Sequence, residues 1–191
     1  YNPQGCLGGV MVQPIETRGM HVVTLSGPNE IDVNSNDIDG SGTANAQCKS
    51  YGIKLDTGAG APSGSSGIFR NNILDPGICF TSRYNFAEFT AGADPRIFQN
   101  NDLNPAVAAP TALYLDEGAN GLTMPAQVDG LMGTLAGGTL SVDPLFVQYP
   151  VNFHINANSM CGGKGTPVGA PSVDFSGKPR PSPPSIGAYE P

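Results

Sequence analysis

The sequence predicts an all-β fold in which short strands stack into irregular coils, a parallel β-helix, followed by a proline-rich closing segment. First, 26 glycines and 18 prolines among 191 residues leave little room for long helices. Second, hydrophobic residues make up 39% of the chain, which is enough to build a core. Third, one short motif recurs along the chain. The length suits a single domain, with coils over residues 1–150 and the closing segment of the same domain over residues 151–191.

The recurring motif consists of an apolar residue, two variable residues, Asn, one variable residue and a second apolar residue. It occupies residues 33–38, 69–74 and 98–103. The intervals are unequal, which favours roughly five irregular coils over tight helical repeats. Asn is favoured at bends because it tolerates a left-handed backbone. We therefore expect Asn36, Asn72 and Asn101 to stack as a ladder in which each side-chain amide bonds the next.

Other segments predict the strands and loops around these bends. Alternating apolar residues predict short strands at 113–115, 121–124 and 139–142. Segments rich in Gly, Ser, Ala and Pro predict loops at 56–66, 104–110 and 133–138. Proline crowding predicts that residues 172–184 run extended along the body.

The cysteines and the charge indicate the compartment. Cys6, Cys48, Cys79 and Cys161 stand far apart without a C-x-x-C pair, which favours two disulfides and an oxidising environment. We prefer Cys6 with Cys48 and Cys79 with Cys161, although three connectivities remain open. The net charge of −7 disfavours nucleic acid, and no apolar run is long enough for a membrane span. The absence of an Asn-x-Ser/Thr site favours a bacterial source.

The C-terminal quarter contains five ordered blocks, residues 143–147, 152–155, 159–165, 174–181 and 186–190. They resemble the C-terminal signature of secreted bacterial right-handed parallel β-helix proteins, which runs D-P-x-F, D-F-H-L, S-P-C, D-x-x-G-x-P-R-P and I-G-A-x-E. Asn152 and Met160 depart from that pattern. The resemblance implies a right-handed solenoid and an extracellular or surface location. The family includes adhesins, matrix proteins and relatives of polysaccharide-degrading enzymes, so the resemblance implies no single activity.

Within these blocks, Asp174, Arg180 and Tyr189 are interpreted as structural residues of the closing segment. Such a segment would cover the unpaired backbone groups of the last coil. We expect Arg180 to bond Asp174 or the final carbonyls, and Tyr189 to pack its ring on the body.

No residue set predicts a catalytic or metal site. Residues 32–40 resemble the opening of a calcium loop, but Asp37 stands where Gly is needed and Thr43 where Glu belongs. The ladder explains the same segment, so we expect no cofactor, with Ca²⁺ as the alternative. Carboxylates occur at Asp75, Asp94, Asp102, Asp116, Glu117 and Asp129, and cations at Lys54, Arg70, Arg83 and Arg96, all without a recognisable catalytic spacing. His21 and His154 are the only histidines, and His154 is interpreted as a packed residue of the second C-terminal block.

Glycan contact is the remaining binding hypothesis. The chain has no Trp, but five aromatic residues could line one face: Tyr51, Tyr84, Phe86, Phe89 and Tyr114.

The leading functional hypothesis is a non-catalytic extracellular protein, structural or adhesive, that acts through self-association and glycan contact. An uncapped first coil would expose strand edges to a second chain or to an upstream part of the same precursor. The alternative is a polysaccharide-degrading enzyme, a lyase or glycoside hydrolase, or a fragment of one.

Overall fold

The computed structural model describes residues 15–24, 31–34, 37–39, 48–57, 67–76, 82–105, 110–149 and 151–191. Within these residues strands make up nearly all the regular structure. The helices are single turns, η1 (Ala91–Ala93) and α1 (Pro125–Val128). The all-β prediction is confirmed. No helix in the described part is long and apolar enough to cross a membrane.

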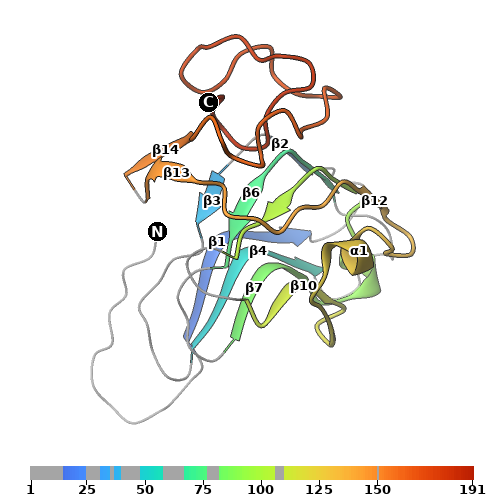
Figure 1. The fold of residues 1–191 in the computed structure, drawn as a ribbon. Helices are drawn as coiled ribbons and strands as arrows, with labels where there is room; N and C mark the ends of the chain where they lie inside the picture. The colour runs from blue at the N-terminus through green and yellow to red at the C-terminus, as the bar shows by residue number, and fades with distance from the viewer. Residues whose placement is uncertain are drawn as a thin grey trace.

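Three parallel sheets form the body of the molecule (Figure 1). The first has the order β1 (Ile15–Thr24), β4 (Cys48–Thr57), β7 (Ser82–Glu88) and β10 (Ala112–Asp116), to which β11 (Asn120–Leu122) adds an antiparallel strand. The second joins β2 (Ile31–Asn34), β5 (Gly67–Arg70), β8 (Ile97–Gln99) and β12 (Leu135–Gly137). The third joins β3 (Asp37–Asp39), β6 (Ile73–Asp75) and β9 (Asp102–Leu103). The chain therefore adds one strand to each sheet in turn.

Asn-Asn pairs make the turns from the second sheet into the third. Asn71 has a φ of 56° between β5 and β6, and Asn100 has a φ of 51° between β8 and β9. Asn is one of the few residues with a side chain that adopts this left-handed backbone readily. The motif therefore marks the turn, but the left-handed residue is the one before the shared Asn72 or Asn101, at a position that the motif leaves variable.

The main core lies between the sheets and takes side chains from all three. Phe69 of β5, Phe86 of β7 and Phe98 of β8 are fully buried and pack edge to face or tilted, with ring centroids 4.9 to 6.5 Å apart. Leu74 of β6 and Leu103 of β9 complete the cluster from the third sheet. Aromatic contacts of this kind stabilise the packing beyond the area that they bury.

Two predicted elements differ from the structure. Residues 133–138, expected to be a loop, contain β12, which pairs with β8 in register from Leu135 and Ile97. Leu135 is exposed, so backbone pairing rather than a buried side chain forms this strand. The strand predicted at 139–142 supplies only one bridge, between Leu140 and Asp102, within the described residues.

The C-terminal segment begins with an antiparallel hairpin, β13 (Phe146–Gln148) and β14 (Asn152–Ile155), and continues without further strands in its described residues. It docks on the Asn turns: Asn71 exchanges two hydrogen bonds with the backbone of Thr166, at 2.7 and 2.9 Å, and the Asn100 amide donates to the Lys164 carbonyl at 2.8 Å. Figure 1 shows it in orange and red beside β3 and β6. The tail thus contacts the body through residues 164–166, and Leu140 pairs with the free side of β9. The prediction that residues 172–184 run extended is wrong: this segment turns back on itself, and Val173 and Pro179 form an antiparallel bridge.

Candidate functional site

A pocket with a volume of about 560 Å³ lies beside the β13–β14 hairpin. Its lining combines aromatic rings, amides and one carboxylate: Asn104, Asp143, Leu145, Phe146, Val147, Tyr149, Asn156 and Asn158. Aromatic rings beside a few fixed polar groups are typical of small-molecule and sugar sites. None of these residues was singled out as a ligand contact from the sequence, because Asp143 to Phe146 belong to a block interpreted as structural.

A strained turn shapes the pocket wall. Leu145 has a φ of 53°, which is unusual for a residue with a large side chain. The Asp143 carboxylate holds the turn by accepting the Leu145 N–H at 2.8 Å, and the Leu145 carbonyl accepts the Asn156 N–H at 2.9 Å. Strain of this kind is concentrated at functional sites in proteins, which makes this turn a candidate for binding.

Three aromatic rings of the β13–β14 hairpin pack against one another. The Phe146 and Tyr149 rings stack at 6.1 Å with an interplanar angle of 18°, and Phe153 meets both edge-on. Phe146 and Tyr149 are half-buried, so each has ring surface that is both supported and accessible. Such a rigid ring surface can stack against a sugar with little loss of conformational freedom.

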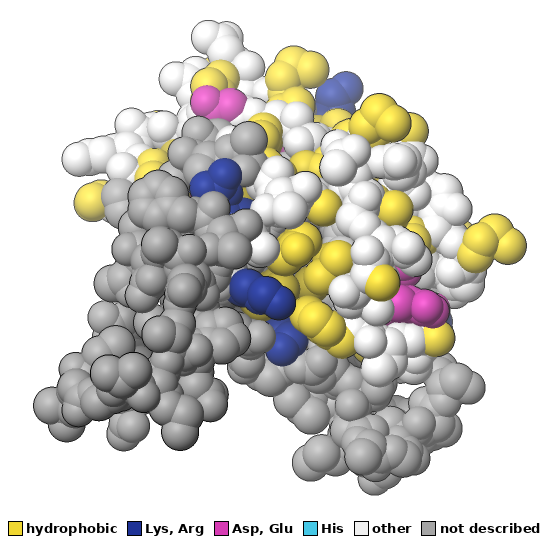
Figure 2. Space-filling view, turned by 90° about the horizontal axis from the view of Figure 1, so that it is seen from below, with side chains coloured by type: hydrophobic (Ala, Val, Ile, Leu, Met, Phe, Trp, Pro, Cys, Tyr) yellow, Lys and Arg dark blue, Asp and Glu magenta, His cyan; other side chains and the backbone are white. Residues whose placement is uncertain are grey.

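The structure separates the five aromatics predicted to line one glycan-binding face. Phe86 and Tyr114 belong to the main core. Tyr51, Tyr84 and Phe89 cluster elsewhere: Tyr51 stacks on Tyr84 at 5.6 Å and is itself buried. Figure 2, which views the molecule from below, shows hydrophobic side chains next to Lys and Arg side chains.

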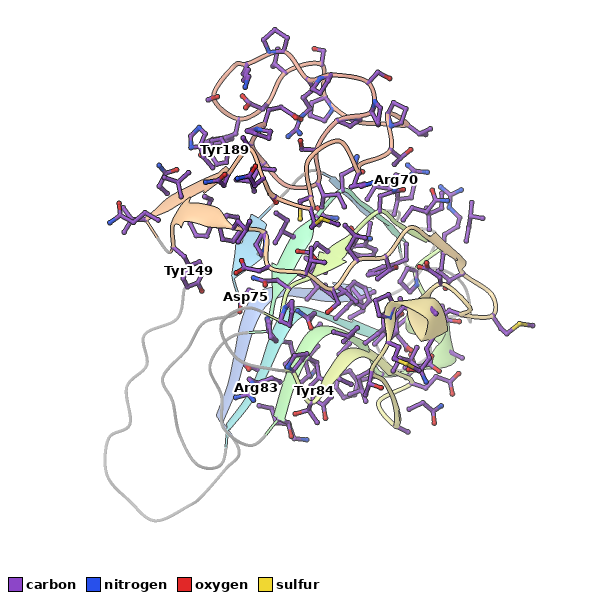
Figure 3. The ribbon with its side chains drawn as sticks, viewed as in Figure 1. Arg70, Asp75, Arg83, Tyr84, Tyr149 and Tyr189 are labelled. Atoms are coloured by element: carbon purple, nitrogen blue, oxygen red, sulfur yellow. The ribbon has the colours of Figure 1, made fainter. Side chains whose placement is uncertain are left out.

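The four cations considered in the sequence for a catalytic role are dispersed in the structure. The Lys54 ammonium lies 4.6 Å from the centre of the Phe89 ring, a cation–π contact. Arg70 is buried on β5, Arg83 is half-buried on β7 and Arg96 is exposed before β8. Figure 3 shows Arg70 and Arg83 on well-separated parts of the body.

Part of the asparagine ladder is visible. The Asn72 side-chain amide donates to Asn101 Oδ1 at 2.9 Å, and the Asn72 backbone N–H donates to the same oxygen at 3.1 Å. The Asn101 amide in turn donates to the Phe69 carbonyl at 2.9 Å. This is the contact predicted for this pair, and both residues are fully buried. Asn36 lies outside the described residues, so the third rung stays a prediction.

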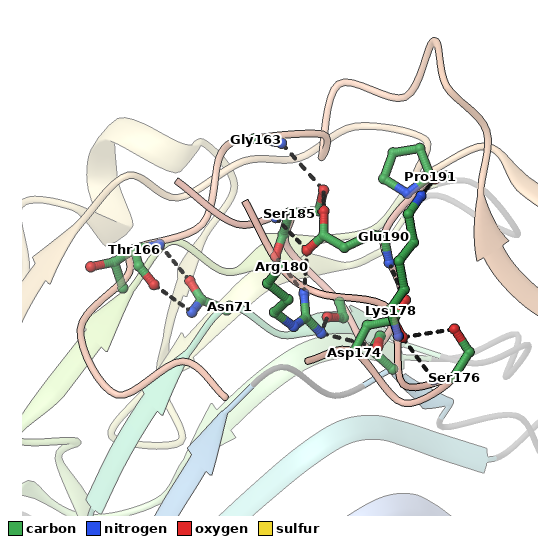
Figure 4. A network of polar contacts seen from close by, with 12 residues as sticks. Asn71, Gly163, Thr166, Asp174, Ser176, Lys178, Arg180, Ser185, Glu190 and Pro191 are labelled. Atoms are coloured by element: carbon green, nitrogen blue, oxygen red, sulfur yellow. Dashed lines mark hydrogen bonds and ion pairs between the residues drawn. The ribbon is translucent and has the colours of Figure 1, made fainter. Parts of the chain in front are cut away.

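The tail residues form a buried polar network (Figure 4). Arg180 makes an ion pair of 2.7 Å with Glu190, and both side chains are 3% exposed. Arg180 also donates to the Gly187 and Ala188 carbonyls, as predicted, whereas its carboxylate partner is Glu190 instead of Asp174. The structural role of the tail thus comes from a contact between its fourth and fifth blocks.

The other two tail residues hold the same region. Asp174 accepts hydrogen bonds from Ser176, Lys178 and Glu190. Burial alone would raise the pKa of Asp174, but these hydrogen bonds outweigh burial and lower it to about 2. The Tyr189 ring stacks on His154 at 4.1 Å, and His154 Nδ1 lies 2.7 Å from Asn152 Oδ1, so both rings are packed as predicted.

A buried carboxyl joins the tail to the third sheet. Asp102 is fully buried, accepts the Val142 N–H at 3.0 Å and lies 3.6 Å from the Cys161 sulfur. Burial raises the pKa of Asp102 to about 7, although the Val142 and Cys161 hydrogen bonds act in the opposite direction. Cys161 packs with Ile73, Ile155 and Ile186 in a second core cluster.

Three carboxyl groups approach one another at the end of the first sheet: Glu88, Asp94 and Asp116, called here the carboxylate triad. Glu88 is fully buried, and its Oε1 accepts the Glu117 backbone N–H. The pKa of Glu88 is raised to about 8, chiefly by burial and also by the Asp116 hydrogen bond and the negative charges of Asp94 and Asp116, whereas the Glu117 hydrogen bond acts in the opposite direction. Sequence spacing could not reveal the triad, because the pairing of β7 with β10 brings its members together.

Several predictions fall outside the described residues. These are the side chains of Cys6, Cys48 and Cys79, together with His21 and the side chains of the calcium-like segment at 32–40. Cys161 is described, and it carries a buried thiol that donates to Asp102 and forms no disulfide, so the preferred pair of Cys79 with Cys161 is not formed in the structure. The pair of Cys6 with Cys48 stays a prediction. Of the remaining predicted carboxylates, Asp75 is buried and Asp129 accepts the Thr139 N–H at 3.1 Å.

Comparison of the chain with protein-family models, with curated proteins and with solved structures finds no match.

Proposed function

We propose that the three parallel sheets are the faces of one right-handed parallel β-helix, and that the chain is a non-catalytic extracellular protein with an adhesive role that binds a neutral glycan in the β13–β14 pocket. The pocket is the observation that carries this function. It offers the stacked Phe146 and Tyr149 rings together with the amides of Asn156 and Asn158. Sugars bind proteins through ring stacking and hydroxyl hydrogen bonds, which these groups can supply. The β-helix is supported by the three-sheet order and the shared core.

Binding is better supported than cleavage. The described lining of the pocket contains one carboxylate, Asp143, whereas glycoside hydrolysis uses two that flank the bond. Glu88 and Asp116 approach each other elsewhere, but Glu88 is fully buried and cannot reach a polymer. The net charge of −7 and the presence of Asp143 favour a neutral sugar over a uronate.

We expect Tyr149→Ala to weaken glycan binding about tenfold, because it removes a stacking ring. Tyr84→Ala is the matched control, since Tyr84 is also half-buried but lies on β7, away from the pocket (Figure 3). Isothermal titration with a panel of neutral and uronate-containing oligosaccharides measures Kd, and chromatography of the same mixtures detects cleavage. Equal Kd values for both variants, or no binding at all, would exclude the pocket.

Self-association is a second proposed activity, favoured by the position of the sheet edges. Within the described residues β1, β2 and β3 are each the first strand of their sheet, so all three sheets present an edge on the same side. Edge strands carry unpaired N–H and C=O groups that can pair with another chain. The strands that pair with these edges come from a second copy of this chain or from an upstream part of the same precursor.

We expect the purified chain to form oligomers or filaments in light scattering and electron microscopy at neutral pH. Along a parallel strand, successive N–H groups point alternately to the two neighbouring strands. Of Thr17→Pro and Arg18→Pro, one therefore removes an outward N–H of β1 and the other a hydrogen bond to β4. The variant that loses the outward N–H should abolish assembly without lowering Tm. The variant that loses the hydrogen bond to β4 should lower Tm. A chain that stays monomeric at every concentration would refute this activity.

A further inference from the structure

The carboxylate triad lies where two parallel strands end. The register pairs Ala87 with Leu115, so the next residues, Glu88 and Asp116, are neighbours on adjacent strands. Asp94 approaches from the residue after η1. One oxygen of each carboxyl group lies within 4.8 Å of the other two.

This arrangement is costly without a positive partner. Like charges that face each other on neighbouring strands destabilise a sheet, and burial increases the cost. The charge effects recorded on Glu88 and Asp94 come from other carboxylates, those of Asp94, Asp116 and Glu117, and each of them raises the pKa. The Lys54 ammonium is engaged with the Tyr51 and Phe89 rings.

A buried acceptor provides a second and independent observation. Glu88 has 0% exposure, and its Oε1 accepts the Glu117 N–H. Its other oxygen, Oε2, is buried and receives no hydrogen bond from an N–H or hydroxyl donor among the described residues. Glu88 does share a hydrogen bond with Asp116, but that contact lies within the triad and needs a proton on one of the two carboxyl groups. Buried polar atoms are almost always satisfied, so an oxygen of this kind beside two more carboxylates calls for a ligand with positive charge. Asp94 and Asp116 are only half-buried and leave a route to solvent.

We propose that Glu88, Asp94 and Asp116 form a binding site for a hard divalent cation, with calcium as the best match. Calcium takes six to eight oxygen ligands in flexible geometry and accepts both monodentate and bidentate carboxylates. Three carboxylates supply three to six of these oxygens by the same rule, and water from the exposed side supplies the others. The ion fixes the turn after β7 and the end of β10 in one position.

The turn after β10 is built to hold Glu88 in place. Glu117 and Gly118 both have positive φ, at 50° and 67°, and their N–H groups donate to the Glu88 side chain and to the Glu88 carbonyl. A side chain at position 118 would approach the Phe89 ring to 2.9 Å, so only glycine fits there. The carboxylate is therefore preorganised for a ligand.

The test measures Tm of the full chain at pH 8 after removal of metal, with CaCl₂ or MgCl₂ added alone, and calorimetric titration with the same salts. Calcium at about 100 times its Kd is expected to raise Tm by roughly 5 °C or more. Glu88→Gln and Asp116→Asn are each expected to abolish that rise and to weaken calcium binding at least tenfold. Glu117→Gln removes one charge from an exposed neighbour outside the triad and is expected to keep most of the rise.

Two results would overturn the proposal: no heat and no Tm rise with either salt up to 10 mM, which is about ten times the Kd of the weakest extracellular calcium sites, or an equal rise in Glu88→Gln, Asp116→Asn and Glu117→Gln. The second result would mean general screening of the net negative charge. Both variants of the triad replace a carboxyl by an amide of the same size, so a loss of calcium binding with an apo Tm that is not lowered separates ligation from misfolding. None of these outcomes depends on glycan binding at the β13–β14 pocket.

Discussion

Arg180→Ala is expected to lower the free energy of unfolding by about 3–5 kcal/mol, the usual cost of removing one partner from a buried ion pair. The substitution leaves the Glu190 carboxylate buried without its cation. It also removes the donors to the Gly187 and Ala188 carbonyls. Equilibrium denaturation by urea measures the change, and limited proteolysis shows whether the tail detaches first.

The matched control is Arg96→Ala, since Arg96 is exposed. Substitutions at such positions usually change stability by less than about 0.5 kcal/mol. The double variant Arg180→Met with Glu190→Leu removes both charges and is expected to be more stable than Arg180→Ala alone. If Arg180→Ala and Arg96→Ala unfold at the same urea concentration, the tail network does not stabilise the fold.

Stability is expected to fall as the pH rises from about 4 to 8, by roughly 8 kcal/mol in total if the two buried carboxyl groups act independently. In the folded chain burial raises the pKa of Glu88 to about 8 and that of Asp102 to about 7, whereas both groups ionise near pH 4 when unfolded. The two groups make their full contribution to the free energy of unfolding below the pKa of the unfolded chain. That contribution is lost as the pH rises through the pKa of the folded chain. Each shift alone corresponds to a loss on the order of 4 kcal/mol.

The acid side has the opposite sign. The pKa of Asp174 is lowered to about 2 in the folded chain, so its contribution is complete above pH 4 and is lost as the pH falls through 2. The stability curve is therefore expected to peak near pH 4 to 5.

Urea denaturation across pH 3 to 9 in metal-free buffer checks this profile. Glu88→Gln and Asp102→Asn should each flatten the decline on the alkaline side, because the amides cannot ionise. Glu117→Gln, at an exposed carboxylate, should leave the profile unchanged. A stability maximum above pH 7 in the unmodified chain would contradict the raised pKa values of both buried groups.

The sequence by itself determined the class of the fold and its turns. Gly and Pro content excluded long helices, and the repeated Asn motif located the turns at Asn71–Asn72 and Asn100–Asn101. Such features are local: a left-handed bend restricts the residue at that bend, whatever surrounds it. The tail blocks likewise predicted that Asp174, Arg180 and Tyr189 serve structure, since their partners lie in the same segment.

Tertiary structure alone decided which distant residues share a site. Glu88 and Asp116 became neighbours through the register of β7 against β10, which no local pattern specifies. The pocket likewise combines residues that are distant in sequence: Asn104 follows β9, whereas Tyr149 and Asn156 belong to the β13–β14 hairpin and the residue after it. The exposed strand β12 formed because β8 offered it a free edge, not because of its own side chains. The physical reason is the same in each case: strand pairing is a contact between backbones distant in sequence, and its partner is fixed only once the sheets pack.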